Sequence, residues 1–259
     1  MPLLLSTHRF FASVAALVVG LAIPSVAARA EESNPYAAAV LADRPISFHR
    51  CDEAEGKYAE DATGNEHRGA LKNVKGGEPS AHPALGTCFV FNGKSSRVQI
   101  PAHSDYKVGK GDFSVEFWFN CHNPMNSRGE ILKFKGEGKD FGILKPVGNS
   151  NFIAVARPDR PFQAQTDPFS IGVWHHAVYV RRGGVDHWYL DGSLTGTSTG
   201  NSLVMDMNAD ILIGADHHGD PNRVARDNCW NGLIDELAIY ASALTAGQVE
   251  EHYKAAQVK

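Results

Sequence analysis

The fold is decided by the stretch from Trp174 to Tyr253, which opens with WHHAVYVRRGGVDHWYLDGSLTGT, residues 174–197. Alternating apolar and polar side chains predict three strands there: Trp174–Val180, Val185–Leu190 and Ser193–Thr197. Arg181-Arg182-Gly183-Gly184 separates the first two strands, and Asp191-Gly192 separates the second from the third. A type I′ turn needs positive φ at both central positions, a conformation that Asp-Gly favours. The stretch therefore predicts two tight hairpins in an antiparallel sheet.

The rest of this stretch predicts two more strands and a closing helix. Ile211–Ala215 is a short strand candidate, Asp216–Asn231 is a long polar loop, and Leu233–Tyr240 is apolar enough for a central strand. Thr245 and Gln248 form a capping box at the start of the helix. The apolar residues expected around this helix are Leu244 and Val249 at the staple positions, with Val249, Tyr253 and Ala256 facing the sheet.

The preceding residues predict further short elements around a polar, turn-rich region at Asp52–Gly77. Asp112–Cys121 is the clearest strand, because its phenylalanines share one face with Val115, whereas Glu116 and Trp118 lie on the other. The other expected elements are a short helix or ordered lead-in at Tyr36–Leu41, strands at Pro45–Cys51, Glu130–Lys135, Asp140–Leu144 and Phe152–Arg157, and a hairpin of Thr87–Asn92 with Ser96–Ile100 around Gly93.

Residues 1–30 have the features of a secretory signal peptide. His8 and Arg9 give a short basic start, Phe10–Ile23 is an uncharged apolar run, and Ala28-Arg29-Ala30 is a small-x-small cleavage site. A spanning helix needs about 20 apolar residues, more than this run contains, so a membrane anchor is the weaker alternative. We expect residues 31–259 to form one domain that is secreted or resides in the periplasm or cell envelope, and that is not integral to the membrane.

The net charge of the exported chain limits the classes of macromolecule that it can bind. Removal of Arg9 and Arg29 with the signal segment changes the formal net charge from −4 to −6. A mildly acidic surface disfavours nucleic acid and anionic membranes as partners.

The four cysteines are Cys51, Cys88, Cys121 and Cys229. An even number in an exported chain indicates two disulfides with three possible connectivities, and the lack of a Cys-x-x-Cys pair argues against a zinc ribbon.

Eight motifs follow one another in a characteristic order. They are Ile46-Ser47-Phe48-His49-Arg50-Cys51-Asp52-Glu53, Asp61-Ala62-Thr63-Gly64-Asn65, Phe89-Val90-Phe91-Asn92-Gly93, Phe113–Phe119, Trp174-His175-His176, Tyr189-Leu190-Asp191-Gly192, Ile213-Gly214 and Asn231-Gly232-Leu233-Ile234-Asp235-Glu236-Leu237. This order resembles the LamG-like jelly-roll family, within the concanavalin A-like lectin/glucanase superfamily. The resemblance implies an all-β, two-sheet antiparallel sandwich with a short C-terminal helix, while the family's functions are broad.

The resemblance also implies a structural calcium ion where the last strand meets the first loop. Asp235 would be one ligand, together with Asp61 and backbone carbonyls near Gly64 and Asn65. Ca²⁺ takes six to eight oxygen ligands at about 2.3–2.6 Å. Asp235 also shares its expected strand face with Leu237, and a carboxylate turned into a core needs a partner. The alternative is that Asp235 caps a turn or accepts backbone N–H bonds.

Two regions contribute candidate ligand-binding residues. Glu116 and Trp118 are expected on the open face opposite the phenylalanines, where an indole ring can stack on a sugar. The Asp216–Asn231 loop has groups that suit sugar hydroxyls or, less readily, a transition metal. The complete set is Trp118, Glu116, Asp216, His218, Asp220, Asn222 and Arg226. Ordinary tryptophan packing and a solvated loop are the alternatives.

The resembled fold also implies a disulfide pairing. It pairs Asp112–Cys121 antiparallel with Leu233–Tyr240, which brings Cys121 towards Cys229. The implied bridges are Cys51–Cys88 and Cys121–Cys229, each stabilising the fold by about 2–4 kcal/mol.

The sequence favours binding over catalysis. Retaining glycoside hydrolases of similar architecture carry alternating acids on one strand, whose carboxyl groups lie about 5–5.5 Å apart. The chain has no Glu-x-Asp run, and Asp235 and Glu236 are adjacent, so they point to opposite sides of a strand. We therefore expect a non-catalytic domain that recognises a carbohydrate or an extracellular protein. The alternatives are a structural or adhesion component of the cell envelope and, less favoured, a glycan-active enzyme.

Overall fold

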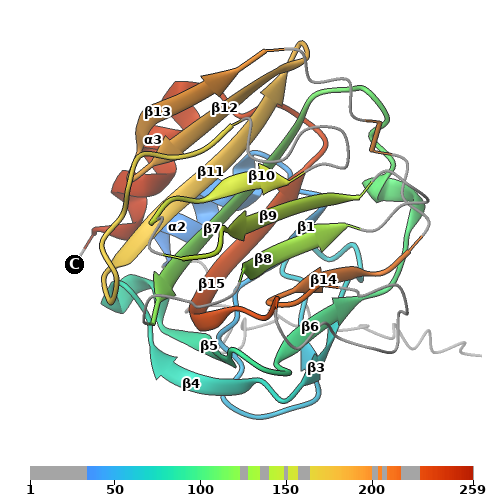
Figure 1. The fold of residues 1–259 in the computed structure, drawn as a ribbon. Coiled ribbons are helices and arrows are strands. Elements are labelled where there is room, and N and C mark those ends of the chain that lie inside the picture. Colours follow the sequence, from blue (N-terminus) through green and yellow to red (C-terminus); the bar gives the residue numbers. More distant parts are fainter. Residues whose placement is uncertain are drawn as a thin grey trace, which may run out of the picture.

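The computed structural model describes residues 34–122, 128–134, 140–148, 151–156, 164–199, 204–205, 209–216 and 228–258. Two antiparallel sheets lie face to face as a sandwich, which confirms the predicted fold class (Figure 1). In this part of the chain, no helix has the length and apolar character needed to cross a lipid bilayer. The signal segment lies outside the described residues, so its removal stays a prediction.

The first sheet contains eight strands among the described residues. Their order is β13 (Ser193–Ser198), β12 (Val185–Leu190), β11 (Trp174–Arg182), β7 (Phe113–Cys121), β15 (Asn231–Tyr240), β5 (Thr87–Asn92) and β4 (Lys75–Pro79), with β1 (Ser47–His49) also pairing with β15. The apolar strand β15 therefore lies between two partners, as its sequence predicts.

The second sheet contains seven strands in the same described ranges. Their order is β10 (Ala154–Ala156), β9 (Phe141–Lys145), β8 (Gly129–Phe134), β14 (Ile211–Ile213), β6 (Arg97–Ile100), β3 (Gly69–Lys72) and β2 (Tyr58–Ala59). The short strands β2 and β3 lie in the predicted turn-rich region Asp52–Gly77, and β4 begins in it. Few of their side chains are apolar, so the period-two signal there is weak.

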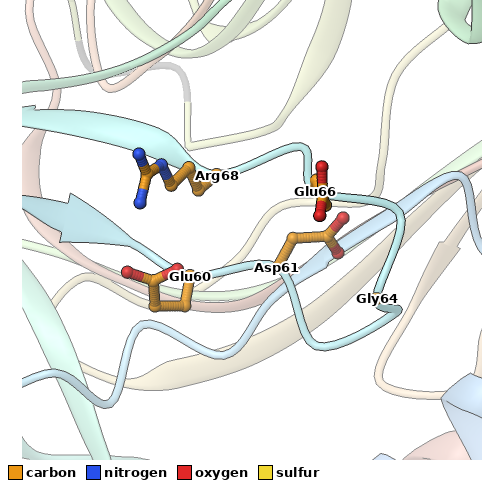
Figure 2. A pocket seen from close by; sticks show the side chains of 5 residues that line it. All are labelled: Glu60, Asp61, Gly64, Glu66 and Arg68. Atoms are coloured by element: carbon orange, nitrogen blue, oxygen red, sulfur yellow. The ribbon is translucent and has the colours of Figure 1, made fainter.

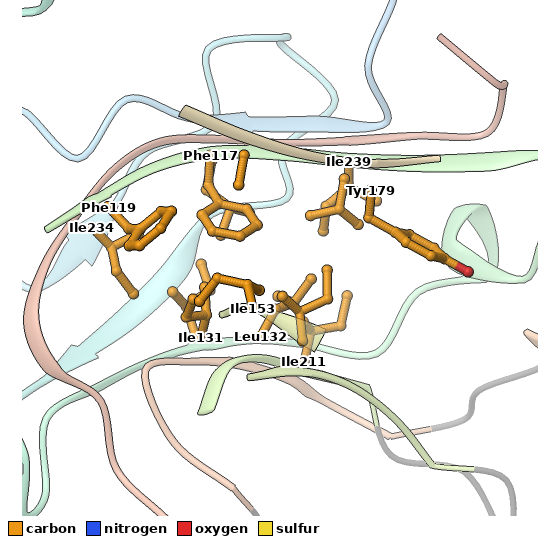
Figure 3. Packing of buried hydrophobic residues seen from close by; sticks show 14 of the residues in the cluster. Phe117, Phe119, Ile131, Leu132, Ile153, Tyr179, Ile211, Ile234 and Ile239 are labelled. Carbon is orange, nitrogen blue, oxygen red and sulfur yellow. The ribbon is translucent and has the colours of Figure 1, made fainter. Parts of the chain in front are cut away.

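The main core fills the space between the two sheets. Figure 3 shows Phe117, Phe119 and Ile239 of the first sheet facing Ile131 and Ile211 of the second. The phenylalanines of β7 all belong to this cluster, as their alternation predicts, whereas Trp118 lies in a different cluster on the other side of the sheet. The sequence therefore predicts the inner face of the first sheet, whereas the segments that cover its outer face become evident only in the structure.

Two helices cover the outer face of the first sheet. α2 (Pro35–Ala42) and α3 (Ala246–Ala256) pack there side by side (Figure 1), and Tyr36, Val40 and Val249 join one apolar cluster with Trp118. The capping box of α3 is formed as predicted, because Thr245 Oγ1 accepts from the Gln248 N–H and Gln248 Oε1 accepts from the Thr245 N–H. Two short 3₁₀ helices, η1 (Pro83–Leu85) and η2 (Ser104–Tyr106), lie in connections.

Both predicted hairpins of the meander are present. The turn between β11 and β12 has φ of 56° at Gly183 and 77° at Gly184, and the next turn has φ of 51° at Asp191 and 79° at Gly192. Positive φ at both central residues is the type I′ signature. Residues 174–197 therefore form the two predicted hairpins, and β13 lies at one edge of the first sheet.

The predicted hairpin around Gly93 is wrong. β5 pairs with β15 and β4 in the first sheet, whereas β6 pairs with β14 and β3 in the second. Both strands send apolar side chains into the shared core, for example Phe91 and Val98. The alternation of two strands in opposite layers therefore looks like that of a hairpin, although the chain crosses between the sheets at Gly93.

The predicted face of β15 is also wrong, because the strand contains a β-bulge. Its register with β7 shifts between Asp235 and Ala238, and Glu236 has φ of 50°. Ile234 and Leu237 both enter the main core as a result. The extra residue reverses which side chains point inward, so Asp235 does not share one continuous face with Leu237.

The two predicted disulfides are absent from the structure, which describes all four cysteines. Each cysteine is buried and none is bridged to another. Cys121 belongs to the core between the sheets, whereas Cys229 packs with Leu212 and Ala215 in a separate cluster. Cys51 donates to the His49 carbonyl at 3.5 Å and Cys88 to the Pro79 carbonyl at 3.7 Å. The Cys51 and Cys88 thiols nevertheless lie close enough to affect each other electrostatically.

Candidate functional site

The loop between β2 and β3 is organised around the Asp61 carboxylate. Asp61 accepts hydrogen bonds from the backbone N–H groups of Phe48 at 3.0 Å, Thr63 at 3.1 Å and His67 at 3.0 Å, and from the Thr63 hydroxyl. Burial raises the pKa of Asp61, but these donors outweigh burial and leave the pKa below its ordinary value. The side chain therefore fixes the loop as an ionised acceptor.

A surface pocket of about 550 Å³ opens beside this loop. Glu60, Asp61, Gly64, Glu66 and Arg68 line it, and Figure 2 shows their charged side chains around the turn that joins the two strands. Gly64 has φ of 81°, a conformation that carries no penalty for a residue without Cβ. Three carboxylates and one guanidinium thus converge on one recess.

An aromatic ring holds the guanidinium of the pocket. Arg68 Cζ lies 4.2 Å from the centre of the Tyr58 ring, and Tyr58 is 40% exposed. Attraction between the cation and the ring face restrains Arg68 at the pocket wall. The sequence predicts a role for Asp61 but not for the other charged residues of the pocket, Glu60, Glu66 and Arg68. The signal was the run of charged residues on either side of the Asp61–Asn65 turn.

Asp235 lies at the bulge of β15 and is fully buried beside Glu236. It accepts hydrogen bonds from the Ser80 hydroxyl and from the Glu236 N–H, while Glu236 pairs with Arg50 at 3.4 Å. Burial raises the pKa of Asp235 well above its ordinary value, and burial raises the pKa of Glu236 to about 8 despite Arg50. Asp235 is therefore satisfied by donors within the protein at the bulge.

The donors around Asp61 and Asp235 do not fit a calcium site shared by these two carboxylates. Both oxygens of Asp61 already accept N–H or O–H bonds, and Asp235 is satisfied by a different set of donors. Asn65 donates from its side chain to the Ile46 carbonyl. Calcium needs oxygen atoms that face the ion, so the geometry favours the turn-capping alternative, and calcium stays a prediction to be tested.

The prediction that Glu116 and Trp118 lie on an open surface is wrong. Both residues lie on the predicted side of β7, but α2 and α3 cover them, so Glu116 is 0% and Trp118 2% exposed. Tyr36, His176, Tyr240 and His252 donate to the Glu116 carboxylate at 2.8–3.1 Å. Neither side chain can meet a sugar in this fold; they attach the helices to the sheet.

Asp216 takes part in a buried charge network on the second sheet. Arg128 bridges Glu130 at 3.0 Å and Asp216 at 2.9 Å, and Lys133 lies 3.6 Å from Asp216. Burial raises the pKa of Glu130 to about 8, against the opposing effect of Arg128. The other predicted residues of this loop, His218, Asp220, Asn222 and Arg226, lie outside the described residues.

The sandwich, with a polar pocket at a loop, defines a protein of lectin-like architecture. A family model described as the concanavalin A-like lectin/glucanases superfamily matches residues 92–250, more than half of the chain. The chain therefore belongs to this family, which confirms the LamG-like resemblance. No curated protein matches the chain in sequence.

Solved structures with the same fold include toxin domains and an enzyme. The binding domain of Paraclostridial mosquitocidal protein 1 has a TM-score of 0.63 at 16% identity, over 82% of this chain and 52% of that one. The binding domain of botulinum neurotoxin serotype D has a TM-score of 0.60 at 13% identity, over 82% of this chain and 52% of that one. Trypanosoma rangeli sialidase in complex with the inhibitor DANA has a TM-score of 0.60 at 14% identity, over 80% of this chain and 32% of that one.

This chain thus spans about half of those toxin domains and a third of the sialidase. At these identities the likeness concerns the fold alone. The fold is shared by binding domains and by a catalytic protein, so function has to be argued from the site.

Proposed function

We propose that this protein is an exported, non-catalytic binding domain whose pocket between β2 and β3 takes a carbohydrate. The observation that supports the proposal is the convergence of Glu60, Asp61, Glu66 and Arg68 on a recess of about 550 Å³. This volume is within the usual range for small-ligand sites, about 300–1,000 Å³. The predicted signal peptide supports export, and secretion, periplasm or cell envelope is the proposed location.

The chemistry of the lining suits a ligand rich in hydroxyl groups. Carboxylates accept hydrogen bonds from hydroxyls, and the guanidinium donates several in a fixed plane. Tyr58 holds Arg68 in place before any ligand arrives, and such preorganisation reduces the entropic cost of binding. Three acids against one base also make the recess net negative, so a neutral or cationic sugar is favoured over an anionic one.

An extracellular protein is the alternative ligand, and a structural or adhesion role in the cell envelope is the alternative function. A contiguous exposed apolar area of several hundred Å² would favour a protein partner. The exposed large apolar side chains of the described residues come from separate segments: Leu41, Tyr58, Val147, Val173, Leu194 and Val258. The proposal therefore rests on the charged side chains that converge on the pocket and not on the distribution of these apolar side chains.

Catalysis is the less favoured alternative. Hydrolysis of a glycosidic bond needs one carboxyl group that stays protonated as the general acid. Asp61 has a lowered pKa and its oxygens are occupied by four donors, which is unsuited to that role.

A glycan array probed with the exported protein tests the proposal. We expect binding to a limited set of neutral or amino sugars, with the signal lost in Glu66→Gln and in Arg68→Ala. Lys72→Ala is the matched control, because Lys72 is exposed on β3 and does not line the pocket. A wild-type protein that binds no glycan, or pocket variants that bind as the wild type does, would overturn the proposal.

A further inference from the structure

Two histidines and an aspartate meet beside the pocket. His67 lies in the loop between β2 and β3, and its neighbours Glu66 and Arg68 both line the pocket. His103 and Asp105 come from the start of η2. One potential ligand atom from each of the three side chains lies within 4.8 Å of the other two. The two segments are far apart in sequence, so the fold creates this juxtaposition.

The contacts of the three side chains hold them in this arrangement. His67 Nε2 lies 3.0 Å from Asp105 Oδ2, and His103 Nδ1 lies 3.2 Å from Asp105 Oδ1. The rings of His67 and His103 have centroids 4.6 Å apart, and the Tyr106 ring is 5.0 Å from that of His67. The carboxylate therefore already lies between the two imidazoles.

Burial differs sharply across the group. The side chain of His67 is 5% exposed, whereas those of His103 and Asp105 are 51% and 47% exposed. The backbone N–H of His67 donates to Asp61 at 3.0 Å, which ties the buried imidazole to the pocket loop. One ligand is thus fixed by the fold, and the open side of the group faces solvent.

We propose that His67, His103 and Asp105 bind a divalent transition-metal ion such as Zn²⁺. Two imidazoles and one carboxylate suit such ions, whereas Ca²⁺ and Mg²⁺ prefer sites made entirely of oxygen. Three protein ligands leave a coordination position for water or a ligand hydroxyl. The bound ion would fasten the pocket loop to η2, because its ligands come from both. This site stands whether or not the pocket binds a carbohydrate.

Titration of tag-free, metal-stripped protein with Zn²⁺ by calorimetry, and with Co²⁺ by visible absorption, tests the proposal. We expect one ion per chain and an intense Co²⁺ d–d spectrum typical of four or five ligands. His103→Ala and Asp105→Asn should each weaken binding by about tenfold or more, since even outer-shell partners of metal ligands typically contribute that much. Both side chains are about half exposed, so the metal-free variants should stay folded, which circular dichroism checks.

Two controls separate this site from other histidines. His122→Ala should bind Zn²⁺ as the wild type does, because His122 is not part of the group. A His217→Ala/His218→Ala double variant should also retain binding. The proposal is overturned if the wild type binds no Zn²⁺ or Co²⁺, if His103→Ala and Asp105→Asn bind normally, or if the double variant alone abolishes binding.

Discussion

At the scale of single residues, Glu116 shows how a buried charge organises the fold. Its carboxylate accepts from two tyrosines and two histidines, which come from α2, β11, β15 and α3. Burial opposes ionisation of Glu116, but His252 and His176 outweigh it and hold its pKa far below the ordinary value. His252 also pairs with Asp43 at 3.1 Å. One residue thus fastens both helices to the sheet.

This cluster predicts a loss of stability as the pH rises from about 6.5 to 8. Burial would lower the pKa of His252, but Glu116 and Asp43 raise it to about 8. The folded protein therefore holds a proton that the unfolded chain releases near pH 6.5, so the stabilisation is complete below that pH and lost above 8. A shift of this size corresponds to about 2 kcal/mol.

Urea unfolding at pH 6 and pH 8.5 measures this effect in the wild type and in His252→Gln. Glu130 and Glu236 also have pKa values of about 8 in the folded protein. The difference in pH-dependent stability between the wild type and the variant therefore isolates the contribution of His252. We expect a flatter pH dependence in the variant. Equal dependence in both proteins would show that the Glu116–His252 pair does not carry the effect.

Asp61 gives the residue-scale test of the calcium prediction. If Asp61 caps the loop, Asp61→Ala leaves three backbone N–H groups without their acceptor and costs about 1–3 kcal/mol. Calcium should then leave the melting temperature of metal-free wild-type protein unchanged, because an ion that does not bind cannot stabilise the native state. A rise in melting temperature with calcium, reversed by chelator and absent in Asp235→Ala, would restore the shared calcium site.

At the scale of elements, the sequence correctly predicts those strands, turns and helix ends that are determined by residues close together in the chain. The alternation of β7, the turn residues of the meander and the capping box of α3 all act within a few residues, and all are confirmed. The Gly93 hairpin failed because strand partners are chosen by the whole sandwich. The face of β15 was mistaken because a single bulge residue reverses the alternation, and nothing in the local pattern marks it.

The cap of α3 supports an element-scale prediction. Thr245→Ala removes the hydroxyl that accepts from the Gln248 N–H at 3.2 Å, and loss of an N-cap typically costs about 0.5–2 kcal/mol. Thermal unfolding should show a lower melting temperature for this variant. Thr199→Ala, in the exposed segment after β13, should melt as the wild type does. A Thr245→Ala protein that matches this control would show that packing alone positions the helix.

At the scale of the whole molecule, the covered outer face of the first sheet decides where a ligand can bind. The sequence placed Trp118 and Glu116 on the correct side of β7 but could not show that helices from both ends of the described chain pack over them. It identified the Asp61 turn but not the pocket beside it, because Glu60, Glu66 and Arg68 converge only when β2 pairs with β3. Tertiary packing therefore moves the candidate site from the outer face of the first sheet to the loop between β2 and β3, at the edge of the second sheet.

A crystal structure of the protein with the glycan that binds it best on the array would show directly whether the pocket between β2 and β3 takes a carbohydrate. We expect a sugar in the recess lined by Glu60, Glu66 and Arg68, with its hydroxyls hydrogen-bonded to those side chains. A sugar bound instead against the Asp216–Asn231 loop, with the recess open to solvent, would contradict this expectation.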